Sequence, residues 1–288
     1  MMDGKETLLL EGGALRGVFT AGVLDVWSER GLYFPRVVSV SAGGLQALSY
    51  LARQPGRNIK INTKYCRDPR YMGMRHLLKK EGYFNFAFIF GELSESLVPF
   101  DYDAFDKAEE IMYAAATECR TGKAVYFKSS EYKARDFMRC CQASCSMPIF
   151  CRTVDIDGAA YVDGGPSVPV APLPEELPFT AEKPVYVLTR DSSYRKKHVP
   201  YLFRMLARRM YRDYPALVEA VNTLPARYNE RAERIAAMER AGKAFAIRPD
   251  RPVTVHRNET NPAKLQALYE EGRKAAEESW TSLQEWLS

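Results

Sequence analysis

The spacing of apolar residues predicts alternating strands and helices in the first part of the chain. Residues 7–11 (TLLLE) are a short apolar run that ends at two glycines, which indicates a buried strand and a tight turn. Residues 17–30 then have the pattern of a helix, residues 36–40 that of a second strand, and residues 43–53 that of a second helix. Two strand–turn–helix units in succession predict a mostly parallel sheet covered by helices.

Further elements are predicted in the middle of the chain. Helical patterns cover residues 104–119 and 132–144, and strand patterns cover residues 123–127, 160–162 and 183–189. Residues 82–105 are rich in Phe and Tyr and lie between these better-defined blocks.

The pattern changes after residue 198. Helical stretches at 199–212, 215–241 and 262–287 surround a candidate pair of short strands at 244–247 and 253–256. We therefore expect an α/β fold with a mostly parallel central sheet at residues 1–190. A mainly helical C-terminal extension, residues 191–288, is expected to pack on it.

Composition narrows the class of protein. The chain has 288 residues, and its net charge of +5 is too mild to require a nucleic acid or another polyanion as partner. The N-terminal sequence lacks a basic segment followed by a long apolar one, and no run of about 18 apolar residues could span a bilayer. We expect a cytoplasmic protein whose six cysteines are free thiols.

Four of these cysteines lie within residues 140–151, where a metal site is one interpretation. Cys140 and Cys141 are adjacent, however, and no histidine is nearby in the sequence, which fits poorly with tetrahedral coordination. Small buried thiols are the preferred interpretation, and we expect no metal.

Ser41 is the candidate nucleophile. It lies in the sequence SVSAG, where the second predicted strand meets the second predicted helix. A G-x-S-x-G turn at such a junction exposes a serine hydroxyl and needs small residues on both sides. Gly43 fits this pattern, whereas Ser39 replaces its first glycine. The alternative is a serine that only caps the following helix.

Two glycine-containing segments could complete a site. Residues 12–17 (GGALRG) turn between the first strand and the first helix, where backbone N–H groups can hold an anion. A dinucleotide-binding loop is the rival interpretation, but Ala14 replaces its second glycine and no acidic residue ends the second strand. Residues 163–165 (DGG) follow a predicted strand and contain either a base or an ordinary turn.

Together these segments resemble the patatin-like family of lipid acyl hydrolases. That family has a glycine-rich oxyanion loop with Arg or Lys near its end, then a G-x-S-x-G turn, then a later D-G-G or D-G-A. The same order occurs here, and residues 143–148 (ASCSMP) are similar to the family's A-S-x-x-x-P stretch. The resemblance covers roughly residues 7–190 and implies a three-layer α/β/α fold. It implies that Ser41 and Asp163 are catalytic and that N–H groups of Gly12, Gly13 and Ala14 form the oxyanion hole. The supporting residues of the motifs are then Arg16, Gly17, Gly43, Gly164 and Gly165.

The activity that the resemblance implies is hydrolysis of phospholipids or other acyl esters by a Ser–Asp dyad, without a cofactor. An unperturbed aspartate has a pKa of about 3.9 and is a weak base, so we expect its carboxylate to bond directly to the Ser41 hydroxyl. A Ser-His-Asp triad that uses His198 or His256 is an alternative. A non-catalytic lipid-binding relative is another, because Ser39 and Ala14 depart from the motifs.

Residues 190–212 are strongly basic, with eight Lys or Arg against one acidic residue. Arg204, Arg208 and Arg212 share one face of the predicted helix, while four apolar residues gather toward another: Leu202, Met205, Leu206 and Met210. Such a helix can rest on an anionic membrane surface. The alternative is an ordinary surface helix whose apolar face is packed against the protein.

Overall fold

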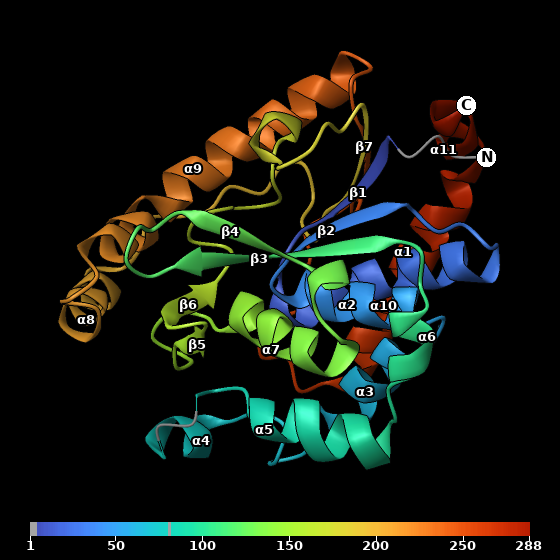
Figure 1. Ribbon diagram of the computed structural model, residues 1–288. Coiled ribbons are helices and arrows are strands. Elements are labelled where there is room, and N and C mark those ends of the chain that lie inside the picture. Colours follow the sequence, from blue (N-terminus) through green and yellow to red (C-terminus); the bar gives the residue numbers. More distant parts are fainter. Residues whose placement is uncertain (1–4, 80–81) are drawn as a thin grey trace.

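A computed structural model describes residues 5–79 and 82–288, so residues 1–4 of the predicted first domain lie outside the described part. A mixed sheet lies at the centre with helices on both faces (Figure 1). Its strands are β1 (Glu6–Leu10), β2 (Arg36–Val40), β3 (Ile111–Glu118), β4 (Ala124–Lys128), β5 (Val154–Ile156), β6 (Ala159–Asp163), β7 (Lys183–Val187) and β8 (Phe245–Ile247). The strand order is β5-β6-β3-β2-β1-β7-β8, and β4 pairs with β3 outside this order.

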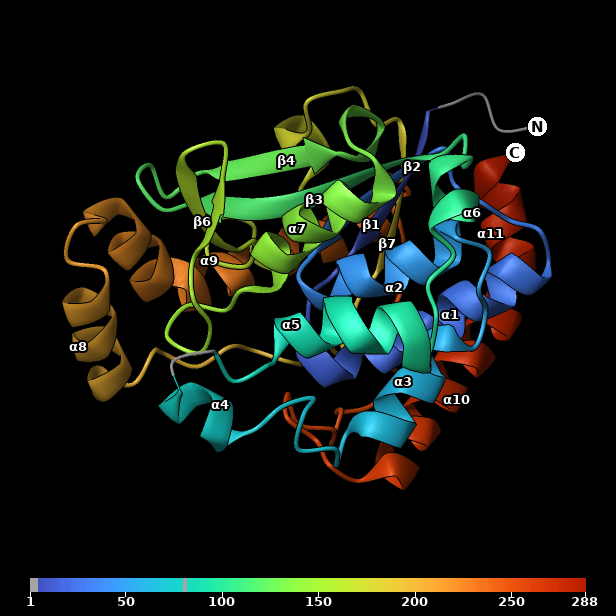
Figure 2. The same cartoon turned by 60° about the horizontal axis from the view of Figure 1, so that its bottom comes forward.

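The helices form the outer layers. They are α1 (Val18–Glu29), α2 (Ala42–Leu51), α3 (Arg57–Tyr65), α4 (Met74–Leu78), α5 (Phe86–Phe88), α6 (Tyr102–Asp106), α7 (Ala134–Cys145), α8 (Tyr201–Met210), α9 (Pro215–Arg240), α10 (Pro262–Glu278) and α11 (Trp280–Leu287). A π-helical segment, η2 (Ile89–Leu97), continues α5, and a 3₁₀ turn, η1 (Ala14–Gly17), precedes α1. Helices α1, α2 and α7 lie on one side of the sheet, and α9 crosses the other side (Figures 1 and 2).

The central strands run parallel and are buried on both faces. β1 pairs in parallel with β2 and β7, β2 with β3, and β7 with β8. Leu8 and Leu10 pack into the core on the side of α1, while Leu9 packs into a second core together with Tyr228 of α9. A continuous apolar run suits such a strand because side chains on both of its faces are covered by helices. The predicted three-layer α/β/α fold is confirmed.

Residues 104–119 do not form the predicted helix. α6 ends at Asp106, and β3 occupies the second half of this segment. The sequence AAA at 114–116 favours a helix by intrinsic propensity, but these residues are fully buried between β2, β4 and β6. The backbone of β3 is also approached closely from β6, because a Cβ on Gly164 would lie 2.4 Å from the carbonyl oxygen of Ala115. Strand pairing therefore overrides the local preference.

The predicted pairing of residues 244–247 with residues 253–256 is also wrong. β8 pairs in parallel with β7 at the edge of the central sheet, and residues 253–256 form no strand. The edge of β7 offers a row of N–H and C=O groups beside a buried core, so a strand added there satisfies groups that an isolated hairpin would leave open. The predicted helix at 262–287 is divided at Ser279 into α10 and α11.

Helix α10 packs closely against α1 at a pair of glycines. A Cβ on Gly272 would lie 2.1 Å from the carbonyl oxygen of Phe19, and a Cβ on Gly22 would lie 2.1 Å from that of Tyr269. Only glycines at these two positions let the backbones of the two helices approach so closely. Residues 191–288 thus contribute both a strand of the central sheet and a helix against its first helical layer, whereas a domain boundary near residue 190 stays a prediction.

Candidate active site

Strand β3 brings Ser41 and Asp163 together although they are far apart in the sequence. β2 pairs in parallel with the first part of β3, where Val40 lies opposite Ala115. β6 pairs antiparallel with the last part of β3, where Asp163 lies opposite Ala116. The C-terminal ends of β2 and β6 therefore meet beside the middle of β3. The first residue after β2 consequently faces the last residue of β6.

Ser41 occupies the tight turn between β2 and α2, with φ 53° and ψ −129°. A residue other than glycine in this region is strained, and such strain is typical of a nucleophile turn. A Cβ on Gly43 would lie 3.0 Å from the carbonyl oxygen of Glu11, so glycine is needed there. The Ser41 hydroxyl makes no capping bond to α2; it donates to Oδ2 of Asp163 at 2.5 Å. Ser41 thus stands at the N-cap position of α2, but its side chain does not cap the helix.

Gly44 makes room for the serine that replaces the first glycine of the motif. The Ser39 side chain is buried, and its hydroxyl donates to the carbonyl oxygen of Tyr113 on β3 at 3.3 Å. A Cβ on Gly44 would lie 3.2 Å from that hydroxyl oxygen. The second glycine of the sequence SAGG thus leaves the space that Ser39 fills, and the turn keeps its shape.

The carboxylate of Asp163 is buried and is bonded at both oxygens. Oδ2 accepts the Ser41 hydroxyl, and Oδ1 accepts the backbone N–H of Gly165 at 2.7 Å. A Cβ on Gly165 would lie 3.0 Å from Oδ1, which explains the second glycine of the sequence DGG. Burial raises the pKa of the Asp163 carboxyl above its ordinary value, while the bonds from Ser41 and Gly165 act in the opposite direction.

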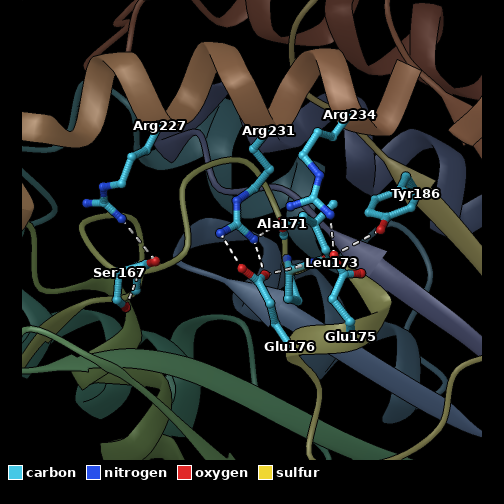
Figure 3. A network of polar contacts seen from close by, with 11 residues as sticks. Ser167, Ala171, Leu173, Glu175, Glu176, Tyr186, Arg227, Arg231 and Arg234 are labelled. Atoms are coloured by element: carbon cyan, nitrogen blue, oxygen red, sulfur yellow. Dashed lines mark hydrogen bonds and ion pairs between the residues drawn. The ribbon is translucent and has the colours of Figure 1, made fainter. Parts of the chain in front are cut away.

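Arginines of α9 hold the segment that follows Asp163 (Figure 3). Arg227 donates to the carbonyl oxygen of Ser167 at 3.3 Å. The Ser167 hydroxyl lies 2.8 Å from that of Thr117, which donates to the backbone carbonyl of Asp163 at 2.8 Å. Two ion pairs complete the network, Arg231 with Glu176 and Arg234 with Glu175. The position of Asp163 thus depends on β3 and on the long helix across the sheet.

The glycine-rich loop lies directly against Ser41. A Cβ on Gly12 would lie 2.8 Å from the Cβ of Ser41. Across residues 5–79 and 82–288, no acceptor takes a hydrogen bond from the backbone N–H groups of Gly12, Gly13 or Ala14. Ala14 has φ 50°, a left-handed conformation that turns the chain into η1. Three N–H groups without an acceptor thus lie in the loop beside the hydroxyl.

Arg16 and Gly17 complete this loop in different ways. A Cβ on Gly17 would lie 3.2 Å from Nε2 of Gln46, so glycine allows η1 to pack against α2. The Arg16 side chain is only 6% exposed, and its Nε has no hydrogen-bond partner in the described part of the chain. Burial, followed by repulsion from Arg190 and Arg257, lowers the pKa of Arg16 to about 10.

Ser144 joins the two halves of the site. Its hydroxyl accepts the N–H of Ser41 at 3.0 Å, and its carbonyl accepts the N–H of Gly164 at 3.2 Å. In the sequence, Ser144 stood out only because it belongs to the ASCSMP stretch, which resembles a family motif. A serine at the end of a predicted helix carries no local signal for such a bridging role.

An apolar cavity of about 70 Å³ opens on one side of Ser41. Its wall combines residues of α2, α3 and α7 with the aromatic segment at 84–90, whose role the sequence did not indicate. The residues of this segment that line the cavity are Phe84, Phe86, Ile89 and Phe90. Ser41 also lines a second cavity, of about 580 Å³, together with Asp163. That cavity includes Lys196, Tyr228 and Arg257 from the C-terminal part of the chain, which sequence reasoning missed.

Histidines and cysteines contribute little to this geometry. His198 lines the second cavity, but among the described residues no histidine bonds to Ser41 or Asp163. The six cysteines are buried free thiols, and burial raises the pKa of Cys141 and Cys145 well above the ordinary value. No cluster of three or more His, Cys, Asp or Glu side chains suited to a metal ion occurs in the part of the chain that the structure describes.

Comparison with known proteins gives the family. A family described only as a domain of unknown function matches residues 214–288. The protein YjjU of Escherichia coli (strain K12), described as uncharacterized, is 28% identical over 170 residues, which are 56% of this chain and 46% of that protein. The chain thus spans less than half the length of this curated relative. VipD from Legionella pneumophila aligns with 97% of this chain and 67% of its own, at a TM-score of 0.46 and 11% identity. The patatin-like phospholipase family matches residues 8–174, more than half of the chain, and the protein therefore belongs to that family.

Proposed function

We propose that the protein is a serine acyl hydrolase that cleaves carboxylic esters of lipids with Ser41 as nucleophile and Asp163 as base. Membership of the patatin-like phospholipase family supports acyl hydrolase activity in general terms. The observation that supports the specific mechanism is the 2.5 Å hydrogen bond from the Ser41 hydroxyl to Oδ2 of Asp163. It lies at a strained turn, beside three backbone N–H groups without an acceptor.

In the first step, the oxygen of Ser41 attacks the ester carbonyl and its proton passes to Asp163. The negative charge that develops on the carbonyl oxygen is stabilised by N–H groups of Gly12, Gly13 and Ala14. Asp163 then returns the proton to the departing alcohol, which leaves an acyl group on Ser41. A water molecule repeats the sequence on this acyl-enzyme: Asp163 takes its proton, and Ser41 recovers that proton as the fatty acid leaves.

The raised pKa of Asp163 suits this role. A carboxylate with its ordinary pKa accepts a proton reluctantly at neutral pH, and burial makes the buried carboxyl a stronger base. The apolar cavity suits the acyl chain, because it begins at Ser41 and most of its wall is aromatic or aliphatic. Arg57, Asn58 and Asn62 of α3 are among the polar residues that also line it. The acyl side of the ester would therefore enter this cavity, and the alcohol side would lie in the second one.

A fluorophosphonate probe tests the nucleophile, since it phosphonylates activated serines. We expect stoichiometric labelling of the wild-type protein and complete loss of labelling in Ser41→Ala, measured by intact-protein mass spectrometry. His198→Gln is the matched control because His198 lines the same cavity. It should keep both labelling and hydrolysis of a p-nitrophenyl ester.

Two outcomes would contradict the proposal. Loss of hydrolysis in His198→Gln, or in a folded His256→Gln variant, would indicate a histidine-dependent mechanism. Absence of labelling in a folded wild-type protein would favour a lipid-binding relative without activity, the alternative raised by Ser39 and Ala14.

We further propose that α8 rests on an anionic lipid surface. None of the described helices is long and apolar enough to cross a bilayer, so contact would be peripheral. Leu202 is 75% exposed and Met205 47% exposed, so the apolar face of α8 is not packed against the protein. Arg204 and Arg208 flank this face and are also exposed. Because Phe203 lines the second cavity, a lipid surface beneath α8 would lie next to the site.

A further inference from the structure

A buried carboxylate, that of Glu11, connects helix α9 to the start of the glycine-rich loop. Its Oε1 accepts the hydroxyl of Tyr228 on α9 at 2.7 Å. Its Oε2 accepts the backbone N–H of Thr189, which follows β7, at 2.6 Å. All three residues are buried, and hydrogen bonds to a charged acceptor are strong ones. Burial, and then the charge of Glu11, raises the pKa of Tyr228, so its hydroxyl stays protonated and can donate at neutral pH.

The residues next to Tyr228 hold α9 in place on both sides. Arg227 donates to the carbonyl oxygen of Ser167 at 3.3 Å. The side chain of Asn229 accepts the backbone N–H of Lys196 at 2.7 Å and donates to its carbonyl oxygen at 3.0 Å. The Tyr228 hydroxyl is therefore carried by a helix that is bonded to the segments before and after β7.

Thr189 extends this connection to the peptide group between Gly12 and Gly13. Its hydroxyl donates to the carbonyl oxygen of Gly12 at 3.1 Å. A Cβ on Gly13 would lie 2.9 Å from the same hydroxyl oxygen, so Thr189 packs directly against the loop. A trans peptide group is planar, and its C=O and N–H point in opposite directions. The bond to the Gly12 carbonyl therefore also fixes the direction of the Gly13 N–H, which points away from Thr189.

The direction of this N–H matters for the reaction. It is one of the three loop N–H groups that have no acceptor in the described part of the chain. The loop also lies against Ser41, since a Cβ on Gly12 would lie 2.8 Å from the Ser41 Cβ. Hydrogen-bond donors stabilise an oxyanion effectively only when they are already aimed at the place where its charge develops.

We propose that Tyr228, Glu11 and Thr189 position the Gly13 N–H for the oxyanion of the reaction. The inference rests on the proposed function, because an oxyanion forms only if Ser41 attacks an ester. The three are positioning residues, since they act through the peptide group between Gly12 and Gly13. Tyr228 lies in residues 214–288, which match a domain of unknown function, and outside the residues 8–174 of the patatin-like match. The C-terminal region would thus help to shape the oxyanion hole.

Two substitutions that remove a single hydroxyl test this role. Thr189→Val keeps the shape of the side chain and the backbone N–H that bonds to Glu11, and Tyr228→Phe keeps the ring. We expect each variant to lower kcat for a p-nitrophenyl ester by on the order of tenfold and to leave KM within about twofold of the wild type. A misdirected oxyanion donor weakens binding of the transition state and not that of the ester. Steady-state kinetics measures both constants.

Matched controls separate this effect from a loss of stability. Tyr186→Phe removes a hydroxyl from the same core, where Tyr186 donates to the carbonyl oxygen of Pro172 at 3.1 Å. Thr7→Val makes the other exchange on β1, at a buried hydroxyl that has no hydrogen-bond partner in the described part of the chain. Both controls should keep the wild-type kcat, and urea titrations show how far each variant is destabilised.

A carbonyl chemical shift tests the position of the loop without turnover. In protein that contains glycine labelled with ¹³C at the carbonyl and with ¹⁵N, an HNCO spectrum shows only glycines that follow another glycine, namely Gly13, Gly44 and Gly165. The Gly13 signal, identified by its loss in Gly13→Ala, reports the Gly12 carbonyl that Thr189 bonds. We expect it to move in Thr189→Val and Tyr228→Phe, while the other two signals stay in place.

A Gly13 signal that stays in place in both variants would overturn the proposal. Wild-type kcat in both variants would also overturn it, and so would a fall in kcat that Tyr186→Phe reproduces. If the wild-type protein hydrolyses no ester, the proposed hydrolase function fails, and the Gly13 signal still decides whether Thr189 and Tyr228 hold the loop.

Discussion

Asp163 holds a carboxylate in a buried environment that disfavours its charge. The folded-state pKa is raised, so the fold favours the protonated form, and the ionised form carries an energetic penalty at neutral pH. This penalty is absent below the unfolded-state pKa, grows as pH rises from that value to the folded-state pKa, and is constant above it. Each unit of elevation corresponds to about 1.4 kcal/mol of free energy.

We therefore predict that Asp163→Asn unfolds at a higher denaturant concentration than the wild type at pH 7. The amide can still accept the N–H of Gly165 but carries no charge to desolvate. The difference in the free energy of unfolding should shrink as pH falls toward 4, since the wild-type carboxyl then becomes protonated. Urea titrations followed by tryptophan fluorescence at several pH values measure it.

Asp213→Asn is the control for this stability experiment, because Asp213 is exposed and should change the free energy of unfolding little at any pH. A less stable Asp163→Asn protein at pH 7 would mean that the bonds from Ser41 and Gly165 outweigh the cost of burial.

Residues near Ser41 were predictable because their signals are local. A glycine-rich loop after β1 and a serine turn after β2 can be recognised within a few positions, and family resemblance added Asp163. The link between them could not be predicted, because it depends on the register of β3, whose alanines favour a helix when considered alone. Lys196 and Arg257 were missed as site residues because no sequence spacing relates them to Ser41.

At the scale of elements, α8 is unusual because four of its apolar residues are exposed, namely Leu202, Met205, Leu206 and Met210. The alternative of a packed apolar face is wrong, since Leu202 and Met210 are exposed and Ala207 is the buried residue of the helix. Phe203 contributes the main aromatic contact, with its ring 5.8 Å from that of Phe150. An exposed apolar strip bordered by arginines matches the surface of an anionic bilayer in both hydrophobicity and charge.

We predict that Arg208→Glu weakens binding to vesicles containing anionic lipid by on the order of tenfold or more, since each basic residue near such a surface contributes about 1 kcal/mol. Binding of the wild type should weaken as salt concentration rises. Lys274→Glu makes the same change in charge on α10, far from α8 in both views of the molecule (Figures 1 and 2), and should bind as the wild type does. Vesicle sedimentation measures the bound fraction, and equal binding to neutral vesicles would exclude the electrostatic contribution.

At the scale of the whole molecule, the C-terminal part is built into the α/β fold. β8 lies at the edge of the sheet, and α10 crosses α1 at Gly22 and Gly272. The hydroxyl of Tyr269 on α10 donates to the buried carboxylate of Asp25 on α1 at 2.7 Å. Because of this close backbone contact and buried hydrogen bond, we expect the two parts of the chain to unfold together.

We predict that Gly272→Ala lowers the free energy of unfolding by about 1–3 kcal/mol or more, because the new methyl group has no space against the backbone of α1. A single cooperative transition at lower denaturant concentration is expected. Ala267→Ser, which adds one atom at an exposed position of the same helix, should change the free energy by less than about 0.5 kcal/mol. Two separate transitions, one of them still at the wild-type midpoint, would show instead that residues 191–288 unfold independently.

Ser41 lies where an apolar cavity and a cavity lined by charged residues meet, and this has a consequence for product release. The two fragments of an amphiphile cut at that point differ sharply in their affinity for water. Under the proposed mechanism, the alcohol would leave through the larger second cavity, whereas the fatty acid would be retained among the aromatic rings. Release of the fatty acid, and not the chemical steps, would then limit the turnover of long-chain esters.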